Sequence, residues 1–322
     1  MLRKRFVVGI FTVGLIALSA GGAAGQNYPN RLIRIVTSGA GGGGDLVARL
    51  IAQGLTSSLS QQVIVDNRSG SVVIPAESVA KSPPDGYTLL VFASTFWLLP
   101  FLQDKVSYDP VKDFSPITLA VISPNILVVH PSLPVKSVKE LIALAKARPG
   151  EINYASGITA ASSHLAAELF KAMAGVNIVR VPYKQNAMAI SGLVSGETQL
   201  LFSTKPLVDP HIRSGRLRAL AIANAQRSAV APELATVAAS GLPGYEYAST
   251  IGLFAPAKTP EEIVRRLNQE SARSLNTAET KKRFLDAGSE VVANSPEQFA
   301  ADMKADMARM GKVIRNAGIR AE

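Results

Sequence analysis

The stretch LIRIVTSGAGGGGDLVARLIAQGLTSSL, residues 32–59, decides the fold of this chain. Its first part, Leu32–Thr37, is a short run rich in β-branched residues, which is typical of a buried strand. From Asp45 to Leu59 the apolar residues recur every three or four positions, and this spacing predicts an amphipathic helix. A strand that leads through a glycine-rich turn into a helix is the opening unit of an α/β protein.

The same alternation continues along the chain in two series. In the first, the predicted strands Val63–Asp66 and Thr88–Phe92 flank a predicted helix at Val73–Lys81, and this βαβαβ order predicts a parallel sheet with right-handed crossovers. The second series begins after Pro116. Its predicted strands are Asn125–Val129, Asn153–Ser156, Val179–Pro182, Gln199–Phe202 and Leu217–Ala223, and its predicted helices are Ser137–Arg148, Ser162–Ala174, Ala187–Ser195 and Val208–Ser214.

The end of the chain predicts how the two series are joined. After an apolar stretch at Tyr245–Ala255, periodicity predicts three helices, at Pro260–Leu275, Ala278–Ala287 and Pro296–Ala317. This tail is too thin to form its own domain, so we expect it to pack back onto the first series. The expected division is therefore lobe 1 from residues 26–122 plus 245–322, lobe 2 from residues 123–244, and a hinge of two linkers at 120–124 and 242–248. A two-lobed α/β protein of this kind binds its ligand in the cleft between the lobes.

The N-terminus has the three-part pattern of a secretory signal. Met1–Arg5 is basic, Phe6–Leu18 is apolar, and the following small residues offer a cleavage site near Ala24 or Gly25. The apolar core is shorter than the roughly 20 residues that a membrane-spanning helix needs. We therefore expect residues 1–25 to be a cleaved signal peptide and the mature protein to be periplasmic.

Composition excludes several classes of site. The 322 residues include no cysteine, so disulfides, thiolate zinc sites and cysteine nucleophiles are excluded. The three histidines are scattered, and we expect no metal ligand and no cofactor. Removing residues 1–25, which carry three basic and no acidic residues, lowers the formal net charge from +10 to +7. The basic residues are dispersed, which favours attraction of small anions over binding of nucleic acid.

The glycine run permits two interpretations. Gly39-x-Gly41-x-x-Gly44 lies between a predicted strand and helix, and Asp66 ends the next strand, so the pattern formally matches a dinucleotide-binding fingerprint. This match suggests a NAD-dependent dehydrogenase, although four consecutive glycines satisfy almost any glycine pattern. Both interpretations share one physical statement: main-chain N–H groups beside the positive end of a helix attract an anion. We expect Asp45 to cap exposed N–H groups at the start of this helix.

Longer motifs carry a resemblance to a known family. They are Tyr28-Pro29 leading into Gly41–Asp45, Val65–Arg68, Ala80–Leu90, Tyr108–Phe114, Asn153–Ser156, Ser162–Leu165, Val181–Lys184, Gly215–Ala221 and Gly241–Gly244. Together they resemble the Bug-type extracytoplasmic solute receptors of tripartite tricarboxylate transporters, and the resemblance spans Tyr28 to Ile319.

The resemblance implies a two-lobed, type II periplasmic-binding-protein fold that closes on a small organic acid and has no catalytic activity. The expected partners are that ligand and the membrane permease subunits of the transporter, and we expect a monomer. A solute sensor that hands its ligand to a signalling protein would share the fold. In the family, main-chain N–H groups and small hydroxyls hold the carboxylate.

Carried onto this sequence, the resemblance implies ligand-binding residues in both lobes and no catalytic residue. In lobe 1 they are Ser38, Ala40, Gly41, Gly42, Gly43, Asp45, Ser94 and Thr95; in lobe 2 they are Ser156, Gly157, Thr159, Ser162, Ser163, His164, Gln185, Asn186 and Ser203.

Some of these positions differ from the family pattern. Ser203 stands where an acidic residue is common, and Gln185-Asn186 stands where two small residues are common. The loss of an acid removes a repulsion toward anions, while the two amides add donors and acceptors that could bind a second polar group. His164 next to Ser162 and Ser163 suggests a catalytic dyad, but adjacent residues on a helix point in different directions. Contact with the ligand and a structural role at the start of the helix both remain open for His164.

Overall fold

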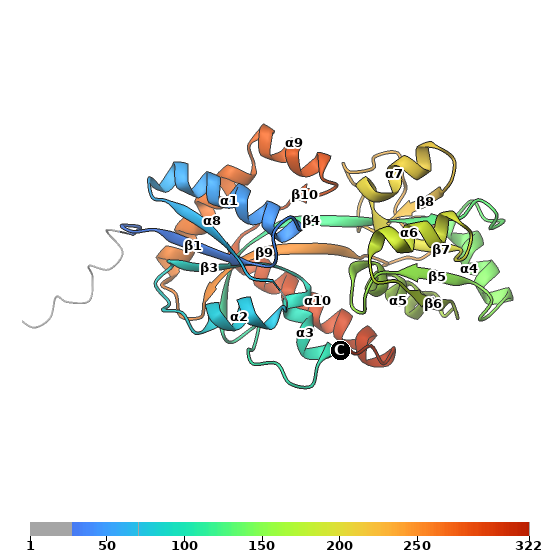
Figure 1. The fold of residues 1–322 in the computed structure, drawn as a ribbon, viewed down its shortest axis with the longest axis horizontal. Coiled ribbons are helices and arrows are strands. Elements are labelled where there is room, and N and C mark those ends of the chain that lie inside the picture. Colours follow the sequence, from blue (N-terminus) through green and yellow to red (C-terminus); the bar gives the residue numbers. More distant parts are fainter. Residues whose placement is uncertain (1–27, 70, 322) are drawn as a thin grey trace, which may run out of the picture.

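The computed structural model describes residues 28–69 and 71–321, so the expected signal peptide lies outside the described residues (Figure 1). The described chain is a mixed α/β structure with a curled sheet in the order β2-β1-β3-β9-β4-β7-β5-β6. Within these residues, no helix combines the length and the apolar character that crossing a membrane requires.

The first half of the sheet is built mainly from the first predicted series. Its strands are β1 (Ile33–Thr37), β2 (Val63–Asn67), β3 (Thr88–Ala93), β9 (Ala248–Pro256), β10 (Glu290–Val291) and the beginning of β4 (Phe114–Val129). As the alternation predicted, β2, β1 and β3 are parallel, and β9 then pairs antiparallel with both β3 and β4.

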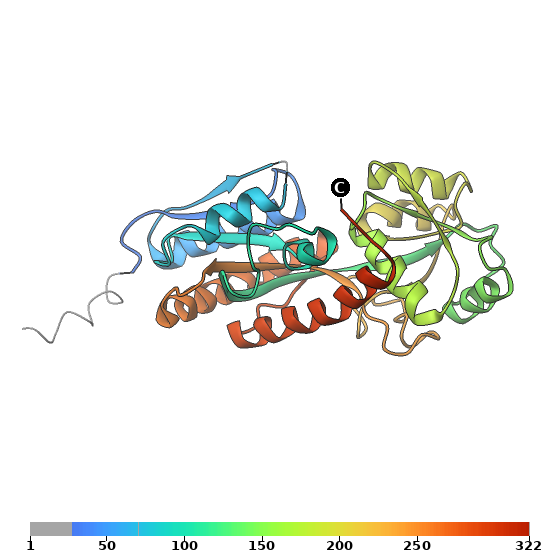
Figure 2. The same ribbon diagram turned by 90° about the horizontal axis from the view of Figure 1, so that it is seen from below.

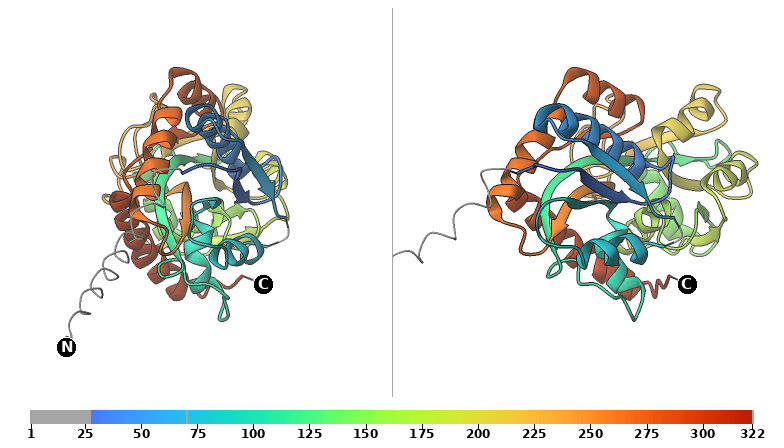
Figure 3. Two further views of the ribbon diagram at one scale, coloured as in Figure 1. Left: turned by 90° about the vertical axis from the view of Figure 1, so that its left-hand side faces the viewer. Right: turned by 60° about the vertical axis from the view of Figure 1, so that its left-hand side comes forward.

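Alternating residues of this half-sheet bury its two faces. Leu89 and Val91 of β3 lie in the core under α1 (Gly43–Leu59) and α8 (Glu261–Leu275). Leu90 and Phe92 point the other way, into the core that also includes residues of α2 (Val73–Ala80). Figure 3 shows α1 and α8 on one side of the strands and α2 on the other.

The second half of the sheet comes from the second predicted series. Its strands are β5 (Asn153–Ser156), β6 (Val179–Pro182), β7 (Leu200–Thr204), β8 (Arg218–Ile222) and the end of β4, and its helices are α4 (Val138–Ala147), α5 (Ser162–Ala174), α6 (Asn186–Val194) and α7 (Lys205–Arg213). Strands β6, β5 and β7 are parallel, whereas β4 pairs antiparallel with β7 and β8.

One strand, β4, belongs to both halves. Residues 114–124 pair with β9, and residues 125–129 pair with β7 and β8. The linker predicted at 120–124 is therefore a continuous strand that crosses from one half to the other. Pro124 stands opposite Ala248 at the end of the ladder with β9, where a missing N–H is tolerated.

The helical tail contacts the first half and also reaches the second half. Helix α8 contacts α1, whereas α10 (Pro296–Asn316) contacts β4, α3 (Thr95–Leu102) and α5. Figure 2 shows α10 extending from one half toward the other, and α9 (Ala278–Asp286) completes the tail. Helix α3 was not predicted, because its sequence TFWLLPFL has no polar face and contains Pro100.

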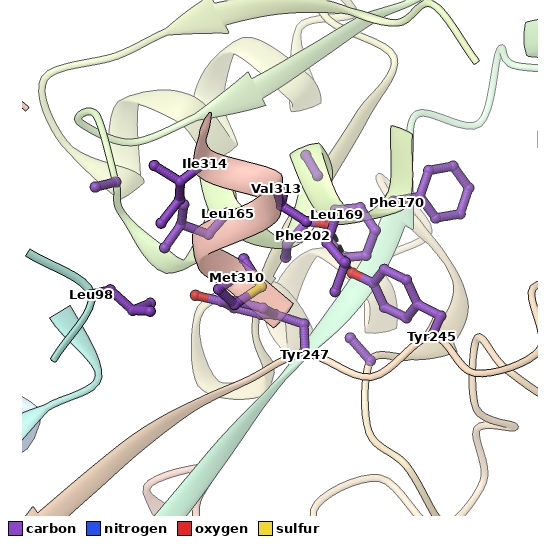
Figure 4. Packing of buried hydrophobic residues seen from close by; sticks show 14 of the residues in the cluster. Leu98, Leu165, Leu169, Phe170, Phe202, Tyr245, Tyr247, Met310, Val313 and Ile314 are labelled. Atoms are coloured by element: carbon purple, nitrogen blue, oxygen red, sulfur yellow. Dashed lines mark hydrogen bonds between the residues drawn. The ribbon is translucent and has the colours of Figure 1, made fainter. Parts of the chain in front are cut away.

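The C-terminal part of α10 joins the cores of the two halves. Met310 and Ile314 are fully buried in one cluster with Leu165 of α5 and Leu98 of α3 (Figure 4). One turn earlier along α10, Asp306 accepts a hydrogen bond of 2.8 Å from the indole N–H of Trp97. The tail therefore packs against both α3 in the first half and α5 in the second.

A glycine contact between β9 and α10 generates a stability prediction. A Cβ atom added at Gly252 would lie 2.1 Å from the Phe299 ring, so Gly252→Ala forces this packing apart. We expect a loss of about 1–3 kcal/mol in the free energy of unfolding, measured by urea denaturation. Gly43→Ala is the control, because its Cβ would meet only an ordinary contact at 3.4 Å. Equal urea midpoints for the two variants would contradict this packing.

Candidate functional site

A pocket of about 300 Å³, including its open mouth, lies at one edge of the second half of the sheet. The residues that line it are Asn125, Ser162, Ser163, Asn186, Leu201, Phe202, Ser203, Thr204 and Leu207. They come from the carboxyl end of β7, the adjacent part of β4, and the first residues of α5, α6 and α7. The carboxyl ends of parallel strands are where open α/β sheets bind ligands.

Three helices begin at this pocket. Helix α5 starts at Ser162, α6 starts at Asn186, and α7 follows Thr204. The first N–H groups of a helix have no partner within the helix, and its N-terminus carries partial positive charge. Every side chain that lines the pocket is neutral. The arrangement therefore suits a small anion that is held by main-chain groups, hydroxyls and amides.

Four of the residues predicted for lobe 2 line the pocket, namely Ser162, Ser163, Asn186 and Ser203. Gln185 lies directly beside them as the N-cap residue of α6. The remaining four, Ser156, Gly157, Thr159 and His164, do not line the pocket and instead belong to the segment that leads from β5 into α5.

The protein's own side chains hold this segment in place. The N–H of Gly157 donates to the Ser163 hydroxyl at 3.0 Å, and the N–H of Ala160 donates to Nδ1 of His164 at 3.1 Å. Ala160 adopts a left-handed conformation with φ of 63°, which a residue other than glycine takes only when its surroundings impose it. These two N–H groups therefore serve the loop in this structure.

Arg180 supports the same segment from the neighbouring strand β6. Its guanidinium donates to the Ser156 hydroxyl at 2.8 Å, to the Gly157 carbonyl at 3.0 Å and to the Thr159 hydroxyl at 3.4 Å. Sequence reasoning missed Arg180, because a single arginine on a short strand gives no signal that it contacts a loop 24 positions earlier. It is a positioning residue for the start of α5.

The predicted residues of the first half form a separate loop and turn. None of Ser38, Ala40, Gly41, Gly42, Gly43, Asp45, Ser94 and Thr95 lines the pocket. The chain from Ala40 to Gly43 is exposed at the start of α1. On the neighbouring strand end, Ser94 is buried and its N–H donates to the Thr250 carbonyl at 2.9 Å, while Thr95 begins α3. The structure thus does not bring the two predicted sets together in one pocket.

Asp45 is a brace for the glycine loop. Its carboxylate accepts the N–H of Gly41 at 3.0 Å and the amide of Asn67 at 2.9 Å, and it pairs with Arg49 at 3.0 Å. The Gly41 hydrogen bond, followed by those from Arg49 and Asn67, lowers the pKa of Asp45 to about 2. We expected Asp45 to cap N–H groups at the start of the helix. It instead accepts the N–H of Gly41, which lies two residues before the first helical residue, Gly43.

Asn125 is the most informative residue that sequence reasoning missed. It lies in β4, its side chain is 1% exposed, and its amide nitrogen donates to the Ser162 hydroxyl at 2.7 Å. The only signal in the sequence is an asparagine at the head of the apolar run NILVV. The other missed lining residues are Leu201, Phe202 and Leu207.

His164 is buried, and its environment keeps it neutral. Burial, helped by the positive charge of Arg180, lowers its pKa from 6.5 to about 4. Its Nδ1 atom accepts the Ala160 N–H, which requires that nitrogen to be unprotonated. Among the described residues, no serine hydroxyl is hydrogen-bonded to this ring, so the geometry gives His164 a structural role at the start of α5.

Solved structures show the same fold. The structure of Rpa4515 from R. palustris with adipate is 38% identical, has a TM-score of 0.73, and covers 91% of this chain and 99% of that one. MatC from Rhodopseudomonas palustris with bound malate is 29% identical, with a TM-score of 0.70 and coverage of 89% and 100%. A TctC solute-binding protein from Polaromonas is 25% identical, with a TM-score of 0.81 and coverage of 90% and 99%. The fold therefore defines a solute-binding receptor.

Sequence comparisons identify the family. The model of the tripartite tricarboxylate transporter family receptor matches residues 47–319. Protein BugT of Bordetella pertussis is 35% identical over 99% of this chain and 98% of that protein. This chain belongs to the tripartite tricarboxylate transporter receptor family, whose members are periplasmic solute-binding receptors and not enzymes.

The environment of His164 predicts how stability depends on pH. The pKa of His164 is about 4 in the folded chain, against 6.5 for an ordinary histidine. Between pH 6.5 and 4, the unfolded chain therefore binds a proton at this residue that the folded chain does not bind. The free energy of unfolding should therefore fall as pH is lowered from about 6.5 to 4. His164→Asn keeps an acceptor near the same place but cannot be protonated, so its pH dependence should be shallower. Urea unfolding at stepped pH measures this, and parallel curves for both proteins would contradict the assignment.

Proposed function

We propose that this chain is a periplasmic receptor that captures a small organic acid and delivers it to the membrane permease of a tripartite tricarboxylate transporter. The observation that carries the proposal is the convergence of three helix N-termini on one neutral pocket. Such a pocket favours a carboxylate without a charged side chain, because helix N-termini supply both N–H donors and positive potential. Relatives with bound adipate and bound malate support the same ligand class.

Capture by closure of two lobes accounts for the separation of the predicted residues. In this proposal lobe 1 comprises residues 26–122 plus 245–322, and lobe 2 comprises residues 123–244. Bending of β4, together with the segment before β9, would bring the exposed loop at 40–43 toward the pocket. The N-terminus of α1 then adds a fourth source of main-chain donors to the anion.

The occupied N–H groups refine where the anion sits. Because Gly157 and Ala160 already donate to Ser163 and His164, we place the carboxylate at the first residues of α5 and α6. Ser203 and Thr204 at the end of β7 would supply hydroxyls from the opposite side. Residues 1–25 would direct the protein to the periplasm and be removed there.

The dehydrogenase interpretation is not favoured. Asp66, which would have to bind a ribose, already accepts from the guanidinium of Arg68 at 3.1 Å and lies 4.0 Å from that of Arg34. Membership of a receptor family also argues against it.

Ligand-induced stabilisation tests the proposed function. A panel of small carboxylates and, separately, NAD should be added to the purified protein while its thermal unfolding is followed. At about 100 times its dissociation constant, a ligand that binds only the folded state adds about 2.7 kcal/mol. We expect at least one acid to raise the melting temperature and NAD to leave it unchanged. Stabilisation by NAD alone would contradict the receptor function.

A substitution in the glycine loop tests the contribution of α1. A Cβ atom at Gly42 would have only one neighbour, at 3.8 Å, so Gly42→Leu should fold normally. The bulky side chain should weaken carboxylate binding by about tenfold or more, because it keeps the main chain away from the anion. Ser57→Leu, at an exposed position late in the same helix, is the control and should bind normally. Calorimetric titration measures the affinities. Normal affinity of Gly42→Leu would show that the loop does not contact the ligand.

A further inference from the structure

Asn125 combines burial with an unsatisfied atom at the pocket. The residue lies in β4 just after the strand passes into the second half, its side chain is 1% exposed, and it lines the pocket. Its amide nitrogen is hydrogen-bonded to Ser162. Among the described residues, no group donates to its carboxamide oxygen. This oxygen is absent from the set of fully enclosed polar atoms that lack a partner, so part of its surface is accessible. The oxygen therefore opens to the pocket.

One hydrogen bond fixes which end of this amide faces the pocket. The amide nitrogen of Asn125 donates to the Ser162 hydroxyl oxygen at 2.7 Å, and an amide nitrogen can only donate. The amide nitrogen of Asn125 is thereby directed to Ser162 and its oxygen to the ligand.

A ligand group opposite this oxygen has to donate a hydrogen bond. A buried acceptor that loses water and gains no donor weakens binding. An ammonium group would donate, but the pocket has no acidic side chain and three helix N-termini, so a positive charge is disfavoured there. A hydroxyl group donates without charge. The exposed aliphatic side chain of Leu207 suits the carbon chain that carries it.

We propose that Asn125 is a specificity-determining residue that selects carboxylates bearing a hydroxyl group over otherwise identical acids that lack it. The carboxylate of such a ligand is held at the helix N-termini, and its hydroxyl donates to Oδ1 of Asn125. This inference rests on the proposed function, because it needs a carboxylate in the pocket. It goes further by naming the second group that the ligand carries, a hydroxyl, and the protein atom that accepts a hydrogen bond from it.

Matched pairs of acids that differ by one hydroxyl test the inference by calorimetric titration: succinate and malate, propionate and lactate, glutarate and 2-hydroxyglutarate, tricarballylate and citrate. For the pairs that bind, we expect the wild-type protein to prefer the hydroxylated member by about tenfold or more. Asn125→Ala should bring this ratio close to one, mainly by weakening the hydroxylated acid. Asn177→Ala, at an exposed position outside the pocket, is the control and should keep the wild-type ratio.

Ser162→Ala provides a second variant that keeps Asn125 itself in place. It removes the hydroxyl that accepts from the Asn125 amide nitrogen, so the orientation of the amide is no longer fixed and the preference should fall. Circular dichroism and thermal unfolding report whether each variant folds, and Ser162→Ala decides the matter if Asn125→Ala does not fold. Equal affinities within the pairs, or a preference that survives in the folded variants, would overturn the inference and leave the proposed function standing. Failure of every acid to bind would overturn the proposed function itself.

Discussion

The sharing of one strand between two half-sheets constrains everything else in this protein. Strand β4 pairs with β9 over its first eleven residues and with β7 and β8 over its last five. Main-chain hydrogen bonds to β9 in one half and to β7 and β8 in the other fix its register, so the direction of the side chains at the crossing is set. Asn125 is the first residue beyond that crossing, which explains how a strand residue comes to form the floor of a pocket at the edge of the sheet.

Polar groups in and beside the two predicted ligand loops have two roles: some hydrogen-bond to atoms of the loops, and others face the pocket. Asp45 in the first half, and Ser163, His164 and Arg180 in the second, satisfy loop atoms and so give the loops a defined shape. The N-termini of α5, α6 and α7 are left facing a neutral pocket. Rigid loops with free main-chain donors bind an anion at a low entropic cost, because little has to be ordered when the ligand arrives.

The sequence predicted what depends on local patterns and missed what depends on distant contacts. The bounds of α5, β5 and β6 agree with the prediction, because period and capping signals lie within each segment. Helix α3 was missed because its sequence has no polar face and contains Pro100, and the crossing in β4 was predicted as a linker although it is continuous strand. Asn125 and Arg180 act on residues 37 and 24 positions away, and neither belongs to a motif. The four predicted residues that do line the pocket came from the family resemblance and not from periodicity. Ser162 and Ser163 lie in a family motif, whereas Asn186 and Ser203 stand at positions where this chain differs from the family pattern.

The hydrogen bond between Trp97 and Asp306 has a practical consequence. Trp97 is the sole tryptophan of the chain. Its indole N–H is hydrogen-bonded to Asp306 of α10, the helix that packs against both halves. The emission of an indole responds to its hydrogen bonding and to the polarity around it. Any rearrangement that shifts α10 against α3 would therefore change the fluorescence spectrum, and the protein carries its own optical reporter without an attached dye.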